Sequence, residues 1–141
     1  MRIGQLATQT GYSVRTIRFY EQSGLLPAPQ RTPAGYRSYD QDAVTRLRFV
    51  RSAQTLGLSL AEIADVLRVR DHNGPPCSYV AQLLDIHISA LDTRIQELIA
   101  LRDELRARRP LDVEPDPTRC RTDHVCYLIE DDASPEEVSG Q

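Results

Sequence analysis

Apolar residues at helical spacing predict two short helices at the start of the chain. The first covers residues 3–9 and the second residues 14–21, with Gly11 between them. Ser13 is a suitable N-cap for the second helix, because its hydroxyl can accept a hydrogen bond from a backbone amide of the first turn. Gly24 is placed to end that helix. Two short helices joined by a tight, glycine-containing turn are typical of a helix-turn-helix.

A proline- and glycine-containing segment, residues 27–40, separates this pair from two further predicted helices. Within it, the stretch PAGYRSY indicates a hairpin turn and a short strand. Asp40 is a candidate N-cap for the next helix, which Gly57 ends. Ser59 can cap the helix after that, and Glu62, three residues later, completes a capping box. Each of the two helices has apolar residues at helical spacing, so each has one face that can be buried.

The longest predicted element is a helix over residues 78–109, which contain no glycine or proline. Apolar residues along it step by four and three, the spacing of the buried seam in a coiled coil. The stripe consists of Leu84, Ile88, Leu91, Ile95 and Leu98. At about 1.5 Å per residue the helix would be roughly 48 Å long, more than a small domain can cover. The stripe is therefore predicted to pair with a second copy; the alternative is that it packs on its own domain.

The predicted elements give a mainly α fold in five parts. Residues 1–71 form a helix-turn-helix domain with a hairpin and a supporting helix pair, residues 72–77 a hinge, and residues 78–109 the long helix. Residues 110–130 form a loop, and residues 131–141 are expected to be a disordered tail. A chain of 141 residues has room for one ordinary domain, or for one small domain with such an extension.

Charge is divided unevenly between the two halves of the chain. Residues 1–70 hold ten arginines and five acidic residues, a net charge of +5. Residues 71–141 therefore hold the other seven of the 17 basic residues and the other fifteen of the 20 acidic residues, a net charge of −8. The basic half suits a polyanionic partner.

Nothing in the sequence predicts secretion or a membrane anchor. There is no apolar run of about 18 residues or more, and the N-terminal MRIGQLATQTG lacks the basic and apolar stretches of a signal peptide. A cytoplasmic protein with no membrane partner is therefore expected. Thiols stay reduced in that compartment, so the three cysteines are interpreted as metal ligands or reactive thiols rather than as disulfides.

Four stretches of the sequence resemble the MerR family of bacterial transcriptional regulators. They are IGQLA at 3–7, SVRTIRFYEQSGLL at 13–26, GYRSYD at 35–40 with Arg31 before it, and LGLSLAEI at 56–63. The resemblance covers residues 1–109 in order. It implies a winged helix-turn-helix and an antiparallel coiled-coil homodimer. It also implies that the dimer binds double-stranded promoter DNA and distorts the spacer to realign the promoter elements for RNA polymerase.

Candidate DNA-binding residues lie on the second helix and on the wing. Ile17 points inward, which leaves Arg15 and Arg18 facing outward, where arginine can pair with guanine edges or with phosphate. The full candidate set is Arg15, Thr16, Arg18, Tyr20, Arg31, Tyr36, Arg37 and Tyr39. For Arg18 and Arg37 the alternative is a solvated surface charge, and for Tyr20 and Tyr39 it is a core tyrosine with a polar tip. Ile17 and Phe19 are expected in the core.

The candidate metal ligands are Cys77, Cys120, Cys126 and His124. If two copies run antiparallel, as the resemblance implies, Cys77 at the start of one long helix meets the loop cysteines of the other chain. Thiolates bind soft or borderline ions. The resemblance to members with a cysteine at this helix start favours a divalent ion, Zn(II), Cd(II), Pb(II) or Hg(II), over Cu(I). With His124 the set suits tetrahedral zinc; without it, three thiolates suit Hg(II) or Pb(II).

Two features depart from the zinc-sensing members of the family. The loop lacks their doubled cysteine. The spacing of 43 positions between Cys77 and Cys120 is also longer than the resemblance leads us to expect. The main alternative function is a thiol-based sensor of oxidants or electrophiles that holds no metal. An enzyme is not expected, because no nucleophile–base pair or phosphate-cradling glycine loop is visible. His87, inside the long helix, is expected to be a satisfied core histidine rather than a ligand.

Overall fold

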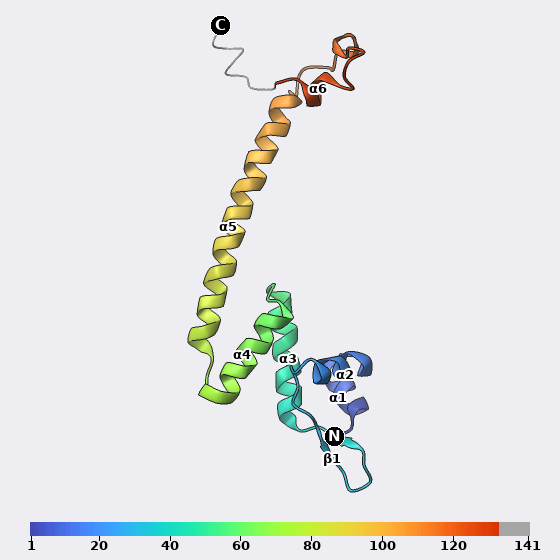
Figure 1. Cartoon of the computed structure of the whole chain (residues 1–141), viewed down its shortest axis with the longest axis vertical. Helices are drawn as coiled ribbons and strands as arrows, with labels where there is room; N and C mark the ends of the chain where they lie inside the picture. The colour runs from blue at the N-terminus through green and yellow to red at the C-terminus, as the bar shows by residue number, and fades with distance from the viewer. Residues whose placement is uncertain (133–141) are drawn as a thin grey trace. The chain divides into compact units, whose positions relative to one another are not determined.

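The computed structural model describes residues 1–132, and its first two helices form the predicted helix-turn-helix (Figure 1). They are α1 (Ile3–Thr10) and α2 (Val14–Gln22). Gly11 ends α1 with a φ of +78°, a conformation that residues with a side chain rarely adopt. The Ser13 hydroxyl accepts a hydrogen bond from the Thr16 amide at 3.1 Å, which confirms the predicted N-cap of α2.

The wing is a two-stranded antiparallel hairpin, as predicted from PAGYRSY. β1 (Gln30–Arg31) pairs with β2 (Arg37–Ser38), with Arg31 opposite Arg37. At the turn, Gly35 has a φ of +88° and its amide donates to the Thr32 carbonyl at 2.8 Å. The hairpin therefore holds three candidate DNA-binding residues, Arg31, Tyr36 and Arg37, on one short element.

The supporting helix pair consists of α3 (Gln41–Thr55) and α4 (Leu60–Asn73). Both predicted caps are confirmed. The Asp40 carboxylate accepts from a backbone amide at 3.1 Å, and Ser59 and Glu62 form a reciprocal capping box. One apolar core joins α1 to α4. Its most completely buried side chains are Leu6, Ile17, Val44, Leu47, Val50, Ile63 and Val66.

A buried arginine joins α3, α4 and the segment after α2. Arg46 is 4% exposed, and its guanidinium lies 2.8 Å from the Asp71 carboxylate. Its Nε donates to the Leu25 carbonyl at 3.2 Å, and Arg70 and Asp42 form a second ion pair nearby at 2.8 Å. Removing the partner of a buried charge is strongly destabilising. These contacts therefore fix how α3 and α4 meet.

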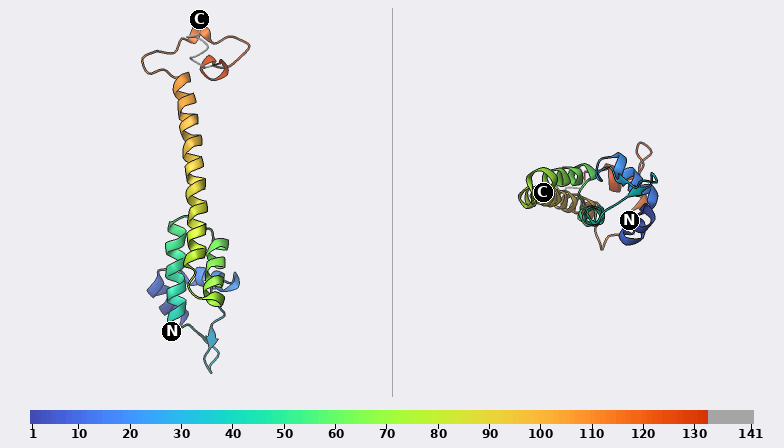
Figure 2. Two further views of the ribbon diagram at one scale, coloured as in Figure 1. Left: turned by 90° about the vertical axis from the view of Figure 1, so that its left-hand side faces the viewer. Right: turned by 90° about the horizontal axis from the view of Figure 1, so that it is seen from below.

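The long helix, α5 (Cys77–Arg108), begins and ends one residue earlier than predicted. Its first turns belong to a compact unit formed by Met1–His87, in which Leu83 is buried. α4 lies beside these turns (Figure 2). The unit extends beyond the predicted boundary at residue 71, because the start of α5 packs on the helix-turn-helix core.

A polar contact also fastens the start of α5 to α4. The His87 Nε2 atom lies 3.0 Å from both carboxylate oxygens of Glu62. Glu62 in turn accepts from the Ser59 amide at 2.9 Å, so one carboxylate serves the cap of α4 and the ring of α5. His87 is thus a partnered, half-buried histidine, as expected.

The second compact unit begins at Ile88. Up to residue 132 it comprises the remaining turns of α5, the 3₁₀ turn η1 (Pro117–Arg119) and the short helix α6 (Tyr127–Glu130). The predicted tail, residues 131–141, lies outside the described residues from residue 133 onward. Among residues 1–132, no helix is both long and apolar enough to span a membrane.

The apolar stripe of α5 is exposed on this single chain. Large apolar side chains recur along the helix with about half of their surface in solvent, for example Leu91 at 61% and Leu98 at 48%. The other exposed members are Leu84, Ile88 and Ile95, followed by Leu101 and Leu105. A contiguous row of exposed apolar side chains marks an interaction surface.

Candidate DNA interface and candidate metal centre

The outward face of α2 carries the arginines that the sequence places there. Arg15 and Arg18 are exposed, whereas Ile17 between them is fully buried. Thr16 is half-buried, and its hydroxyl lies 2.9 Å from that of Ser13 at the N-cap. Phe19 corrects the expectation of a core residue, because it is 52% exposed. Its ring centroid lies 5.9 Å from that of the buried Tyr20.

Tyr20 and Tyr39, both expected to contact DNA, are instead buried at 4% and 5% exposure. The Tyr39 hydroxyl donates to the Glu21 carboxylate, and burial together with that hydrogen bond raises the pKa of Tyr39 above its usual value. Tyr20 packs edge-on against Tyr12, with 5.4 Å between the ring centroids. The structure therefore favours the alternative, that these two tyrosines are core residues with polar tips.

Glu21 connects the wing to α2. Besides accepting from Tyr39, its carboxylate lies 3.5 Å from the Arg37 Nε atom on β2. Both wing residues therefore take their position from one side chain of α2. Arg37 remains a third exposed, so it can contact phosphate while Glu21 orients it.

A basic residue at the N-cap of α1 lies against the wing, and the sequence pattern does not identify it. The Arg2 guanidinium lies 4.2 Å from the ring centroid of Tyr36, which is 53% exposed. A cation over an aromatic face is favourable. On the other edge of the hairpin, Arg31 is exposed and donates to the Gly35 carbonyl at 2.9 Å. No local signal links Arg2 to Tyr36, because 34 positions separate them.

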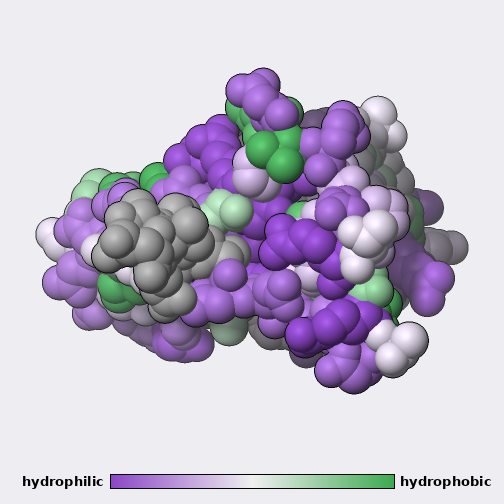
Figure 3. Space-filling model, turned by 90° about the horizontal axis from the view of Figure 1, so that it is seen from above, coloured by the Kyte–Doolittle hydropathy of each residue, from purple (hydrophilic) through white to green (hydrophobic). Residues whose placement is uncertain are grey.

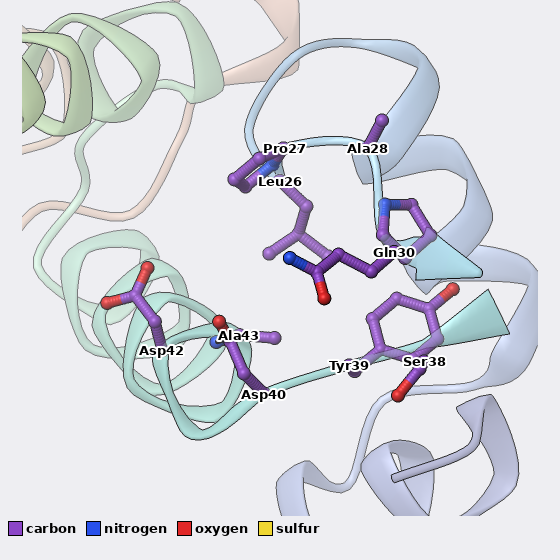
Figure 4. Close-up of a pocket in the computed structure, with 10 residues that line it drawn as sticks. Leu26, Pro27, Ala28, Gln30, Ser38, Tyr39, Asp40, Asp42 and Ala43 are labelled. Carbon is purple, nitrogen blue, oxygen red and sulfur yellow. Dashed lines mark hydrogen bonds between the residues drawn. The ribbon is translucent and has the colours of Figure 1, made fainter. Parts of the chain in front are cut away.

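A shallow hollow of about 310 Å³ lies at the base of the wing (Figure 4). The side chains of Leu26, Gln30 and Tyr39 point into it, from the segment after α2 and from the two ends of the hairpin. Asp40 and Asp42 lie at its edge, and both are engaged, as the cap of α3 and as a partner of Arg70. These carboxylates disfavour a phosphate here, so the hollow is not part of the candidate DNA interface.

The three cysteines are free thiols, one at the start of α5 and two in the loop that follows its end. Cys77 is exposed and is the first residue of α5. Cys120 follows η1 and Cys126 is the N-cap of α6, and both are half-buried. Within residues 1–132, no three potential ligands from one chain lie close enough together to hold a metal ion. One chain therefore does not bring the four candidate ligands together.

Polar contacts give the loop around Cys120 and Cys126 its shape. Tyr127 is buried, and its hydroxyl accepts from the Asp116 amide at 2.8 Å. The Arg119 guanidinium lies 4.2 Å from the centroid of the same ring. The face of the molecule in Figure 3 is largely hydrophilic, with small separate hydrophobic patches. Among the described residues after α5, Tyr127 is the one large apolar side chain that is buried, so hydrogen bonds and charge hold the loop together.

Two ionisable side chains lie against the loop backbone. The Glu130 carboxylate accepts from the amides of Cys126 and Val125, each at 2.6 Å, and these bonds lower the pKa of Glu130. The His124 Nδ1 atom lies 3.2 Å from the Arg121 amide, which can donate to it. A neutral imidazole that accepts at Nδ1 carries its proton at Nε2. The Arg121 carbonyl oxygen lies 3.3 Å from the same Nδ1 atom. In the other tautomer Nδ1 donates to that oxygen, which leaves Nε2 free to bind a metal.

The sequence matches two related families along its helical part. Residues 1–69 match the family described as MerR HTH family regulatory protein, and residues 44–108 match the family described as MerR, DNA binding. The chain is 37% identical over 126 residues to the HTH-type transcriptional regulator ZntR homolog of Haemophilus influenzae, covering 88% of this chain and 93% of that one. It is 40% identical over 97 residues to the mercuric resistance operon regulatory protein of Bacillus cereus, covering 69% and 74%.

Solved structures agree with these relationships. The transcription regulator PbrR691 of Ralstonia metallidurans, in complex with lead(II), has a TM-score of 0.69 and 39% identity, over 85% of this chain and 94% of that one. MerR of Bacillus megaterium, in complex with mercury(II), has a TM-score of 0.60 and 31% identity, over 92% and 97%. The chain belongs to the MerR family of transcription regulators. It is thus a DNA-binding regulator and not an enzyme, and its relatives include metal-responsive ones.

Proposed function

We propose that this protein is a regulator that responds to a soft divalent metal ion and binds promoter DNA as a homodimer. The observation that carries the proposal is the placement of the three free thiols, one at the start of α5 and two in the loop that follows its end. Three thiolates suit Zn(II), Cd(II), Pb(II) or Hg(II). Relatives named for lead, for mercury resistance and for ZntR support this class of ligand.

The dimer is proposed to form through α5. Its exposed apolar stripe has the spacing of a coiled coil, and burying the stripe against a second copy would remove that apolar surface from water. In an antiparallel pair, the start of one α5 meets the end of the other. Cys77 of one chain would then meet Cys120 and Cys126 of its partner, and each dimer would hold two such sites.

The DNA face is proposed to consist of the exposed candidates on α2 and the wing. They are Arg15, Thr16, Arg18, Arg31, Tyr36 and Arg37. Tyr20 and Tyr39 would hold this face from behind. The dimer is proposed to realign promoter elements for RNA polymerase by bending and untwisting the spacer when metal is bound. For this the ion needs to bind one of two dimer states more tightly, by a few kcal/mol.

Putting charge into the stripe tests the dimer. Leu91→Glu or Leu98→Glu should convert the protein to monomers, since each side chain would be buried at the seam. Sedimentation or light scattering measures the result, with Thr93→Glu, at an exposed position on the opposite face of the same helix, as the matched control. A dimer that survives both leucine changes would place the interface elsewhere.

Mixed dimers test the shared metal site. A Cys77→Ser chain paired with a Cys120→Ser/Cys126→Ser chain keeps one complete site if the site crosses the dimer, and none if it lies within one chain. Titration with Cd(II) should therefore give about half of the parent's tight sites in the mixed dimer. Reduced parent protein that binds no Cd(II), yet loses promoter activation when its thiols are alkylated, would favour the thiol sensor instead.

A further inference from the structure

The last residue of α5, Arg108, makes a set of contacts that the sequence does not predict. Its Nη1 atom donates to the backbone carbonyls of Leu128 at 3.2 Å, Ile129 at 2.5 Å and Asp131 at 2.8 Å. The other edge of the guanidinium contacts the Glu104 carboxylate, at 3.1 Å from Nε and 3.0 Å from Nη2. One side chain thus connects the end of the long helix to the backbone of α6 and the residue after it.

The segment that Arg108 holds, residues 128–131, is connected to both loop cysteines. Cys126, the N-cap of α6, lies two positions before Leu128. The Asp131 carboxylate lies 3.7 Å from the guanidinium of Arg119, the residue next to Cys120. Arg119 also lies over the ring of Tyr127, which follows Cys126. The backbone on either side of the cysteine pair therefore takes its position from one anchored segment.

We propose that Arg108 is a positioning residue for metal binding, which holds Cys120 and Cys126 in a fixed arrangement on the end of the dimerisation helix. This inference rests on the proposed metal function. Ordering a loop costs conformational entropy, and a loop that is already ordered binds its ligand more tightly. Along the backbone, residues 109–119 separate α5 from Cys120, whereas Arg108 reaches residue 128 directly. Arg108 therefore also connects the loop to α5 more directly than the backbone does, so metal binding in the loop can affect the helix through it.

The guanidinium is suited to this role by its shape as well as by its charge. Its planar fork presents donors along two edges, so it can contact Glu104 and the loop carbonyls together. Lysine at this position would keep the charge but lose the fork. Arg106, in the same last turn of α5, is exposed and offers a matched control, since changing it removes the same charge without touching the residues 128–131.

The test is Cd(II) binding by the full-length reduced dimer, measured by competition titration and by the Cd(II)–thiolate charge-transfer absorption. Changing groups that orient metal ligands typically costs about 10- to 100-fold in metal affinity. Arg108→Ala should lose affinity by that factor and alter the absorption band, and Arg108→Lys should lie between it and the parent. Arg106→Ala and Arg106→Lys should match the parent in both measurements.

The outcomes separate this inference from the proposed function. A parent protein that does not bind Cd(II) tightly would refute the metal function itself. A parent that binds, with an Arg108→Ala dimer of equal affinity and unchanged absorption, would overturn the positioning role. If Arg108→Ala lowers the helix content or breaks the dimer, Arg108→Lys decides: a folded Lys variant with parental affinity and absorption overturns the role, and one with weaker binding supports it.

Discussion

The helix-turn-helix unit and the loop after α5 are held together by different forces. Residues 1–87 have a continuous apolar core in which seven large side chains are almost completely buried. In residues 88–132, Tyr127 is the one large apolar side chain that is buried. Its neighbours are fixed by Arg108, Arg119 and the Glu130 carboxylate. The unit proposed to bind DNA should thus be stable by itself, and the loop should depend on its polar contacts and on a bound ion.

This difference matters for sensing. A core of interlocking side chains resists partial displacement, because each change of volume is felt by the whole core. Hydrogen bonds on an exposed loop open more easily, since few apolar contacts have to be broken. A rigid DNA-binding unit and a loop proposed to respond to an ion can therefore coexist in one short chain.

The largest expected effect is on the metal side. Cys126→Ser should lower Cd(II) affinity by more than about 100-fold, the upper range for changes that only orient a ligand, because serine stays protonated and is a harder ligand. DNA binding without metal should be unchanged. Competition titration and a promoter-binding assay measure the two effects. Loss of DNA binding in this variant would show that the two regions are not independent.

A large-to-small substitution in the core should instead lower stability and leave metal binding nearly unchanged. Leu47→Ala removes a fully buried side chain and should lower the free energy of unfolding by about 2–5 kcal/mol. Below the unfolding transition, Cd(II) affinity should stay within a few-fold of the parent, because none of the three cysteines belongs to this core. Denaturant unfolding followed by circular dichroism gives the first quantity. A loss of under about 1 kcal/mol would contradict the view that burial holds this unit together.

A single contact on the DNA face should have a moderate effect. Arg18→Ala should weaken operator binding by about 1–3 kcal/mol if the guanidinium reads a base, or reduce the salt slope by about one if it binds phosphate. Whichever of the two effects occurs, it should be the same with and without metal. Fluorescence anisotropy at several salt concentrations distinguishes them. Phe19→Ser on the same helix, which leaves the charge unchanged, is the control for general damage to α2.

The smallest effect concerns pH and the α4 cap. The hydrogen bond from the Ser59 amide, assisted by His87, holds the pKa of Glu62 below its usual value. A depressed carboxyl pKa stabilises the fold above the unfolded pKa, and this contribution is lost as pH falls through the folded value. Glu62→Gln should therefore lower stability near neutral pH and flatten its decline below about pH 4.5. Equal slopes for parent and variant would mean that this cap does not couple folding to pH.

Much of the fold was predictable because its signals are local. The caps at Ser13, Asp40 and Ser59 each accept from an amide three residues ahead, so a short stretch of sequence contains both partners. Gly11 and Gly35 mark turns by the backbone conformation that they alone adopt readily. The stripe of α5 follows from spacing on one helix. The thiols were identifiable as candidate ligands from residue type, since few other side chains bind soft ions.

Only the tertiary structure decided which side chains contact residues far away in the sequence. Tyr39 is buried because Glu21, 18 positions earlier, accepts its hydroxyl, and Arg2 reaches Tyr36 through the packing of the wing. In the sequence, Arg108 is one of several charges at the end of a helix. In the structure, it donates to the backbone of residues 128–131. Each of these contacts requires a loop to close at a cost in conformational entropy. No single stretch of sequence shows whether the contact forms. Local hydrogen-bonding and helical periodicity therefore determined the elements, whereas contacts between distant residues determined what each polar side chain does.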